Sequence, residues 1–219
     1  METQSARHRM VEIQIAKRGV RDQRVLDAMK DVPREEFVAR EIQHRAYDDS
    51  PLPIGFGQTI SQPYVVARMC EMAGLEGDEH VLEVGAGSGY QTAILASLVR
   101  RVTSVEIVPE LARRAAKHLE HLGFENACVL LSDGSAGASA HAPYDAILVS
   151  AGAPRVPTLL VDQLSDGGRL VLPVGERARQ RLCRITRHSH DYDVVYDTAV
   201  RFVDLVGKYG WGGIGAPQA

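Results

Sequence analysis

The sequence predicts an α/β fold with a mostly parallel β-sheet, and three observations support this prediction. Short apolar runs, which are typical of buried strands, alternate with segments of helical periodicity. A glycine-rich turn joins the first of these runs directly to a helix. From residue 181 onward, segments of alternating polarity follow one another without a helix, which indicates an antiparallel edge. The 219 residues are most simply one domain, 1–219, that buries a substantial core.

The composition restricts the classes of partner. A net charge of −3 provides no basic surface for nucleic acid, so we expect no nucleic-acid partner. No apolar run reaches the ~20 residues of a membrane span, and the amino terminus is too polar for a secretory signal. We therefore expect a cytoplasmic protein without a membrane partner. The scattered Cys70, Cys128 and Cys183 are typical of reduced, buried thiols. The eight histidines show no ligand spacing, so no metal is predicted.

Residues 1–47 are predicted to form a helical lobe in front of the sheet. Apolar residues recur at helical spacing over 5–18, and a glycine follows where a helix commonly ends. Asp22 is placed to cap a second helix, which must end near Val32 because a proline follows. Pro33 then opens a third helix with two glutamates in its first turn.

Residues 48–62 have no hydrophobic period and contain two prolines and two glycines, which predicts a shaped loop. A helix begins at Pro63 directly after it. Thr59, Ser61 and Gln62 have side chains that can cap this helix, and capping is one interpretation of them. The other is chemistry, because loops held between rigid elements often carry functional residues.

The glycine-rich turn lies within residues 80–90 and is followed by a helical segment at 91–99. Such a turn places backbone N–H groups and the positive end of a helix at the carboxyl edge of the sheet. A dinucleotide-binding fingerprint needs glycine where Tyr90 stands, which argues against a pyrophosphate-bridged cofactor. The pattern instead resembles the first motif of S-adenosylmethionine-dependent methyltransferases, and a strained turn without a ligand is the alternative. The resemblance implies cofactor contacts for Glu83, Gly85, Gly87 and Gly89.

Acidic residues follow the next two strands. Glu106 ends the strand at 102–106, where a carboxylate can accept hydrogen bonds from both hydroxyls of a ribose, although it can also cap the next helix. Asp133 and Gly134 follow a third buried strand at 127–131. There a carboxylate can accept from an adenine 6-amino group while adjacent amides meet the ring nitrogens. An Asp-Gly pair is also a common turn. It supports an adenine contact only in combination with the glycine-rich turn and Glu106.

The remaining core, within 63–180, continues the alternation of strands and helices. Further strands are predicted at 144–150 and 168–175, with a helix from Pro157 between them. The carboxyl-terminal part, 181–219, adds two alternating segments at 182–188 and 194–203, which bring the sheet to seven strands.

Residues 53–68, Pro-Ile-Gly-Phe-Gly-Gln-Thr-Ile-Ser-Gln-Pro-Tyr-Val-Val-Ala-Arg, closely resemble the signature loop of protein-L-isoaspartate (D-aspartate) O-methyltransferases. Similarity extends in the same order through other segments and covers roughly residues 10–211. Those segments are 32–38, 81–93, 143–147 and 172–175. The resemblance implies a Rossmann-like, S-adenosylmethionine-dependent methyltransferase fold.

The resemblance also implies an activity and a set of site residues. The family repairs damaged proteins by transferring the methyl group of S-adenosyl-L-methionine to the free α-carboxylate of L-isoaspartyl, and in some cases D-aspartyl, residues. S-adenosyl-L-homocysteine is the product, isoaspartyl-containing peptides and proteins are the partners, and a monomer is expected. By position, Ser61 matches the catalytic hydroxyl, and Gln58, Thr59 and Ile60 match the cofactor-facing part of an active-site loop at 48–62.

Three departures from the family pattern concern the substrate side. Asp204 stands where the family usually has proline. The turn at 150–154 replaces a more alanine-rich one. Ser135 and Ala136 stand where an arginine or tryptophan is common.

The proposed chemistry suits these residues. The acceptor is a carboxylate with an unperturbed pKa near ~4, so it is ionised at neutral pH and needs no general base. Strong hydrogen-bond donors would make the carboxylate oxygen less nucleophilic, whereas the neutral hydroxyl of Ser61 can orient the carboxylate. We therefore expect catalysis to come mainly from positioning and the exclusion of water.

Two other functions remain open at this point. One is a different S-adenosylmethionine-dependent methyltransferase acting on a small molecule or on a nitrogen. Nitrogen methylation commonly uses an [DNS]-P-P-[YF] turn after the fourth strand, and the turn at 150–154 does not supply it. The other is a non-catalytic adenosyl-cofactor binder. A disrupted loop beside an intact glycine turn would favour that function, but both are intact here.

Overall fold

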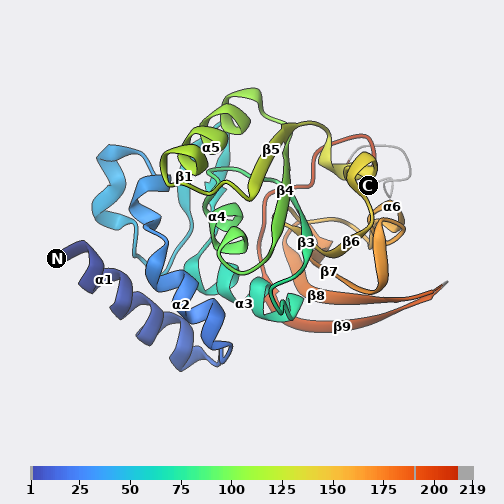
Figure 1. The fold of residues 1–219 in the computed structure, drawn as a ribbon, viewed down its shortest axis with the longest axis horizontal. Helices are drawn as coiled ribbons and strands as arrows, with labels where there is room; N and C mark the ends of the chain where they lie inside the picture. The colour runs from blue at the N-terminus through green and yellow to red at the C-terminus, as the bar shows by residue number, and fades with distance from the viewer. Residues whose placement is uncertain (1, 190, 212–219) are drawn as a thin grey trace.

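A computed structural model of the protein describes residues 2–189 and 191–211. Figure 1 shows a central sheet with the amino-terminal helices along one side and the long carboxyl-terminal strands at the other end. The predicted carboxyl-terminal part reaches residue 219, so its last residues, 212–219, lie outside the described residues.

The amino-terminal lobe begins with one continuous helical run. Helix α1 (Glu2–Met10) continues through a wider π turn and a tight 3-10 turn, and Gly19 ends it with a φ of 104°. Asp22 caps α2 (Gln23–Asp31) by accepting two backbone N–H groups, as predicted. The two turns of the first run are Val11–Ile15 and Ala16–Arg18.

The third predicted helix of the lobe is wrong in length. Only a 3-10 turn, Arg34–Phe37, follows Pro33, because the backbone returns to an extended conformation at Val38. A second 3-10 turn, Arg40–Arg45, leads into the next segment.

The predicted loop at 48–62 contains a small antiparallel hairpin. Strand β1 (Leu52–Gly55) pairs with β2 (Gln58–Ile60), and Leu52 and Ile60 are buried. These strands are too short and too rich in proline and glycine to show a period of two, so their pattern predicts a loop instead. The hairpin leads into α3 (Pro63–Ala73), which begins at the predicted proline.

The main sheet has the order β5-β4-β3-β6-β7-β8-β9 within the described residues. The first five of these strands are parallel, and β8 and β9 continue as an antiparallel meander, which confirms the predicted seven-stranded architecture. The bounds are β3 (His80–Val84), β4 (Arg101–Glu106), β5 (Ala127–Leu131), β6 (Tyr144–Val149), β7 (Leu164–Glu176), β8 (Arg179–His188) and β9 (Asp191–Val200).

Two hydrophobic clusters cover the two faces of this sheet. One joins the amino-terminal lobe and α3 with α4 (Tyr90–Ala96) and α5 (Pro109–His121). The other packs α6 (Thr158–Val161) and the segment around Leu205 against the opposite face. Residues that alternate along one strand, such as Val81 and Leu82, enter different clusters, as the pleat of a strand requires.

Four predictions about these elements need correction. Helix α4 ends at Ala96 rather than continuing to residue 99. Helix α6 is a single turn, because β7 already begins at Leu164. Strand β5 is an edge strand rather than a fully buried one, and Leu131 is 60% exposed. Cys128 on that strand is half-buried, whereas the other two cysteines are buried and all three are free thiols.

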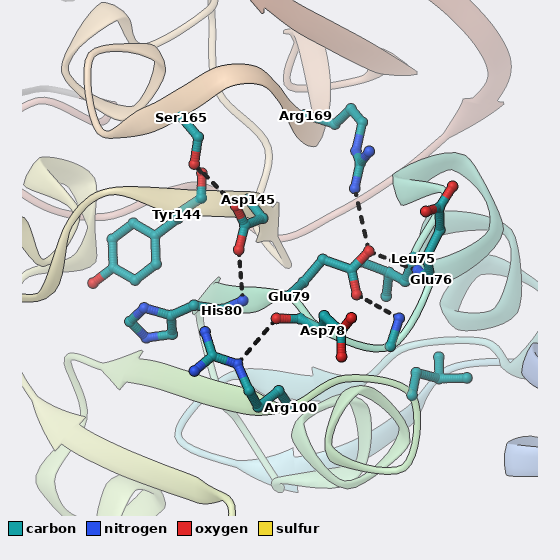
Figure 2. Close-up of polar contacts among 12 residues, drawn as sticks. Leu75, Glu76, Asp78, Glu79, His80, Arg100, Tyr144, Asp145, Ser165 and Arg169 are labelled. Carbon is teal, nitrogen blue, oxygen red and sulfur yellow. Dashed lines mark hydrogen bonds and ion pairs between the residues drawn. The ribbon is translucent and has the colours of Figure 1, made fainter.

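Carboxylates fix the amino edge of the sheet, as Figure 2 shows. Glu79 accepts two backbone N–H groups of the turn before β3 and lies 3.6 Å from the guanidinium of Arg169 on β7. Asp145 accepts the backbone N–H of His80 at 2.8 Å and the hydroxyl of Ser165 at 3.0 Å. These contacts tie β3, β6 and β7 together at the edge opposite their carboxyl ends, in addition to the backbone ladders that set their register.

Candidate active site

A cavity lies at the carboxyl ends of β3, β4 and β6, where ligands bind in open α/β sheets. It holds about 840 Å³ of empty space, its open mouth included. The hairpin strand β2, the glycine turn, the end of β4 and a carboxyl-terminal segment at 203–206 form its walls. Among the predicted site residues, those that line it are Gln58, Thr59, Ile60, Ser61, Glu83, Gly85, Gly87, Glu106 and Gly134.

The glycine turn adopts a conformation that ordinary residues avoid. Gly85 and Gly87 have φ values of 91° and 55°. The hairpin lies directly over this turn, because a Cβ on Gly87 would come within 3.3 Å of Ile54. Gly89 also has a positive φ, but it does not line the cavity. A Cβ there would come within 3.3 Å of the backbone of Ala115, so this glycine lets α4 and α5 approach each other closely.

Glu106 is fixed at the end of β4 and is nearly buried. One carboxylate oxygen accepts the backbone N–H of Gly87 at 2.8 Å, and the other accepts that of Val108 at 2.9 Å. A carboxylate has about four acceptor sites, so both oxygens keep the capacity to accept hydroxyl groups from a ligand in the cavity.

Glu83 is completely buried and lines the same cavity. One oxygen accepts hydrogen bonds from the hydroxyls of Thr92 and Ser104, while the other has no partner among the described residues. Burial raises the pKa of Glu83 to about 7, and the negative charge of Glu106 adds to this effect. A cationic group in the cavity would offset both costs.

Asp133 does not line the cavity, although Gly134 beside it does. Its carboxylate accepts the backbone N–H and the hydroxyl of Ser135 and the backbone N–H of Lys208. Burial raises the pKa of Asp133, but these hydrogen bonds outweigh burial and lower it overall. The carboxyl-terminal segment therefore also binds the carboxylate of Asp133, through the backbone N–H of Lys208. No sequence pattern indicated this contact.

Ser61 lies at the junction of two hollows. It lines the cavity and also an outer groove between the hairpin, α3 and the segment that follows β9. Its hydroxyl makes no hydrogen bond to another described residue, and the side chain of Gln62 at the amino cap of α3 makes no capping bond. The geometry therefore does not favour the interpretation of these residues as helix caps.

Arg34 holds the backbone of Ser61 and was not predicted. Its guanidinium donates to the carbonyl oxygens of Ser61 and Ala46, both at 2.8 Å, and stacks 4.8 Å from the ring centre of Tyr90. Arg34 is fully buried, and burial lowers its pKa to about 10. The sequence places this arginine beside two glutamates, a pattern typical of an exposed helical turn, so nothing local indicated its position.

Two departures noted in the sequence lie at the site. Asp204 lines the cavity and forms an ion pair with Arg177 at 2.7 Å. Arg177 in turn lies over the ring of Trp211, whose indole N–H donates to the carbonyl oxygen of Gly152. Ser150 lines both the cavity and the outer groove.

Comparisons with known proteins agree with this geometry. Residues 5–210 match the family model described as protein-L-isoaspartate(D-aspartate) O-methyltransferase. The chain is 51% identical over 210 residues to protein-L-isoaspartate O-methyltransferase 1 of Syntrophobacter fumaroxidans, covering 96% of this chain and 98% of that one. It is 54% identical over 209 residues to the protein-L-isoaspartate O-methyltransferase of Geobacter metallireducens, covering 94% and 96%.

Solved structures show the same fold. A protein-L-isoaspartate O-methyltransferase superposes with a TM-score of 0.81 at 30% identity, covering 90% of this chain and 65% of that one. A Plasmodium falciparum protein described with the same activity superposes with a TM-score of 0.79 at 26% identity, covering 91% and 98%. It was solved in complex with S-adenosyl-L-homocysteine.

The described part of the chain has no helix with the length and apolar character needed to cross a membrane. Three comparisons agree on the same family: the family model that matches nearly the whole chain, the two relatives, and the superposed structures. The chain belongs to the protein-L-isoaspartate (D-aspartate) O-methyltransferase family, with its Rossmann-like, S-adenosylmethionine-dependent fold.

Proposed function

We propose that the chain repairs damaged proteins by transferring the methyl group of S-adenosyl-L-methionine to the free α-carboxylate of L-isoaspartyl, and also D-aspartyl, residues. The position of Ser61 supports this most directly. It lies where the cavity meets the outer groove, so one hydroxyl is accessible from the cofactor side and from the acceptor side. We also propose that the protein acts as a monomer in the cytoplasm.

The residues of the cavity fit this cofactor. The glycine turn exposes backbone where side chains would intrude, and Glu106 offers a carboxylate suited to two ribose hydroxyls. Glu83 has a buried oxygen that finds no partner within residues 2–189 and 191–211, which suits the positive charge of the cofactor. Gln58, Thr59 and Ile60 form the wall over the turn. The carboxylate of Asp133 accepts three hydrogen bonds from Ser135 and Lys208, which leaves about one acceptor site for the proposed adenine contact, and of this pair only Gly134 lines the cavity.

When bound, S-adenosyl-L-methionine supplies a methyl group activated by a positively charged sulfur. Residues 58–61 of the loop bring a hydroxyl to the cavity rather than a histidine or lysine, and the ionised acceptor needs no general base. Ser61 orients the acceptor carboxylate through its neutral hydroxyl, which leaves a lone pair free to attack the methyl carbon. The hairpin and the 203–206 segment form walls of the cavity, and we expect them to exclude water when cofactor and acceptor are bound, so that positioning accounts for most of the acceleration.

The decisive assay uses two peptides that differ only in an L-isoaspartyl or an L-aspartyl linkage. We expect base-labile label from the labelled cofactor on the isoaspartyl peptide alone, because a methyl ester hydrolyses in base. Stable label on small-molecule or nitrogen acceptors would indicate a different methyltransferase. Binding of the cofactor without any transfer would indicate a non-catalytic binder.

Replacing Ser61 tests its role. We expect Ser61→Ala to lower kcat about 10-fold or more, because a hydrogen bond to a charged group is lost, while the Kd for S-adenosyl-L-homocysteine stays nearly unchanged. Peptide kinetics and calorimetric titration measure the two quantities. Ser139→Ala, an exposed serine outside both hollows, is the control. Equal losses in turnover and cofactor affinity would return Ser61 to a structural role.

A further inference from the structure

Ser150 occupies an unusual position between the cofactor turn and the acceptor side. It follows β6 directly, and its backbone N–H donates to the carbonyl oxygen of Val84 at 2.8 Å. This bond holds Ser150 beside the last residue of β3. A Cβ built on Gly85 would lie 3.6 Å from the Cβ of Ser150, so the side chain lies against the first glycine of the turn.

The hydroxyl of Ser150 keeps a free donor. Gln91, in the first turn of α4, donates to its oxygen at 2.9 Å, and Gln91 is only 6% exposed. A serine hydroxyl has one O–H donor and two acceptor lone pairs, and this bond uses an acceptor. Within residues 2–189 and 191–211, no acceptor receives the O–H group of Ser150. The hydroxyl is therefore oriented by Gln91 and available to a ligand.

Ser150 shares its setting with Ser61. Both are half-buried, and both line the cavity and the outer groove. They come from separate elements, one from the segment before α3 and the other from the end of β6. The two hollows therefore share two serine side chains, each with a neutral hydroxyl.

We propose that Ser150 is a second catalytic hydroxyl, which donates a hydrogen bond to the same acceptor carboxylate that Ser61 orients. This inference rests on the proposed function. A carboxylate held by one hydroxyl can still rotate about its bond to the peptide, whereas a second donor from another direction fixes the plane of both oxygens. Because both donors are neutral, the carboxylate keeps the electron density it needs to attack.

The test combines two variants with a matched control. Ser150→Ala removes the hydroxyl, and Ser150→Thr retains it. Ser165→Ala makes the same change at the opposite edge of the sheet, where the hydroxyl of Ser165 donates to Asp145 (Figure 2). For each purified protein, kcat and KM are measured with the isoaspartyl peptide, and the Kd for S-adenosyl-L-homocysteine is measured by calorimetry.

We expect Ser150→Ala to lower kcat/KM for the peptide by about 10- to 100-fold, the range for a hydrogen bond to a charged group. The Kd for S-adenosyl-L-homocysteine should stay within about twofold, and Ser150→Thr should recover most of the lost activity. Ser165→Ala should keep kcat/KM within about twofold, because it lies far from the reacting groups. A purely structural role for Ser150 would not separate peptide kinetics from cofactor affinity.

A double-mutant cycle tests whether the two serines contact one carboxylate. If they do, the loss in Ser61→Ala/Ser150→Ala is smaller than the product of the two single losses, because a carboxylate already misplaced gains little from the second donor. Losses that multiply would show independent sites and overturn the shared role.

Other outcomes also overturn the proposal. Unchanged peptide kinetics in Ser150→Ala would exclude a contact with the acceptor, and an equal loss of cofactor affinity would make Ser150 a cofactor-binding residue. A wild-type protein that labels neither peptide would mean that the proposed function itself has failed. That result is obtained before any variant is compared, so the two failures are distinct.

Discussion

Two buried ionisable side chains at the site each have one polar atom that finds no hydrogen-bond partner among the described residues. They are the second carboxylate oxygen of Glu83 and one guanidinium nitrogen of Arg34. A buried charge with an unmet hydrogen bond lowers the stability of a fold. Glu83 lines the cofactor cavity, and Arg34 holds the loop of Ser61. The two losses of stability therefore occur at residues of the proposed functional site.

The stability of the protein should depend on the ionisation of Glu83. Its pKa rises from an ordinary value of 4.5 to about 7 on folding. Between these values the folded state retains a proton that the unfolded state releases, so stability falls as the pH rises through about 7, by about 3 kcal/mol in total. Below pH 4.5 both states are protonated and this loss is absent.

We therefore expect Glu83→Gln to gain stability relative to the wild type as the pH rises from about 4.5 to 8. Gln keeps an oxygen for the hydroxyls of Thr92 and Ser104 but cannot ionise. Urea unfolding at several pH values in the absence of cofactor measures the difference, with Glu12→Gln at an exposed position as control. A constant difference at all pH values would contradict this expectation.

Arg34 should be irreplaceable by lysine. Its planar guanidinium reaches the carbonyl oxygens of Ala46 and Ser61 at once, whereas an ammonium group cannot hold both. We expect Arg34→Lys to cost about 2 kcal/mol in urea unfolding and to lower methyl transfer. The same substitution at Arg45, whose ion pair with Asp48 is exposed, should cost less than about 0.5 kcal/mol. Similar losses at both positions would exclude a special role for Arg34.

At the scale of elements, local patterns predicted most strands and helices, because the signals that define each element lie within one continuous stretch of sequence. Pro63 begins α3, Asp22 caps α2, and a glycine follows the ends of α3 and α5. The misses have physical causes. The β1–β2 hairpin is too short to show a period. The edge position of β5 depends on the order of the sheet, which no single strand encodes.

The site was predictable where backbone chemistry determines it. The glycine turn and Glu106 follow directly from the order strand, turn, helix, strand. The contacts of Arg34, Gln91 and Ser150 were not predictable from local sequence, because Arg34 reaches Ser61 and Gln91 reaches Ser150 only through tertiary packing. The contact of Lys208 with Asp133 joins residues far apart in the chain and was likewise invisible in the sequence.

Two glycines with the same backbone requirement should differ in their tolerance of alanine. Gly74 and Gly89 both have positive φ values, but only Gly89 lies against the backbone of another helix. We expect Gly74→Ala to cost about 1 kcal/mol, from backbone strain alone. Gly89→Ala should cost at least about 2 kcal/mol, because α5 must also move away. Thermal unfolding of both variants measures the two values, and a smaller cost at Gly89 would contradict this account.

At the scale of the whole molecule, the amino-terminal lobe and the sheet share their cores. One hydrophobic cluster runs from α1 and α2 into the sheet, and the second uses the other face of the same strands. Arg68 on α3 holds Asp197 on β9 through two hydrogen bonds of 2.8 Å, which ties the edge of the sheet to a helix.

We accordingly propose that residues 1–219 unfold as a single domain. Calorimetry should give one transition whose calorimetric and van't Hoff enthalpies agree, because neither cluster can lose the shared strands independently. Limited proteolysis should yield no stable fragment that corresponds to the lobe at 1–47. Two separate transitions, or a protected fragment, would show that the lobe is an independent unit.

The stacking of Arg177 on Trp211 has a practical consequence. Trp211 is the only tryptophan of the chain, and it lies beside the segment that carries Asp204 into the cavity wall. Its indole N–H also binds Gly152 in the turn after β6. Selective excitation of tryptophan therefore makes the emission of this one indole an intrinsic optical probe of the carboxyl-terminal wall. The filling of the site can thus be followed in real time without attaching a dye.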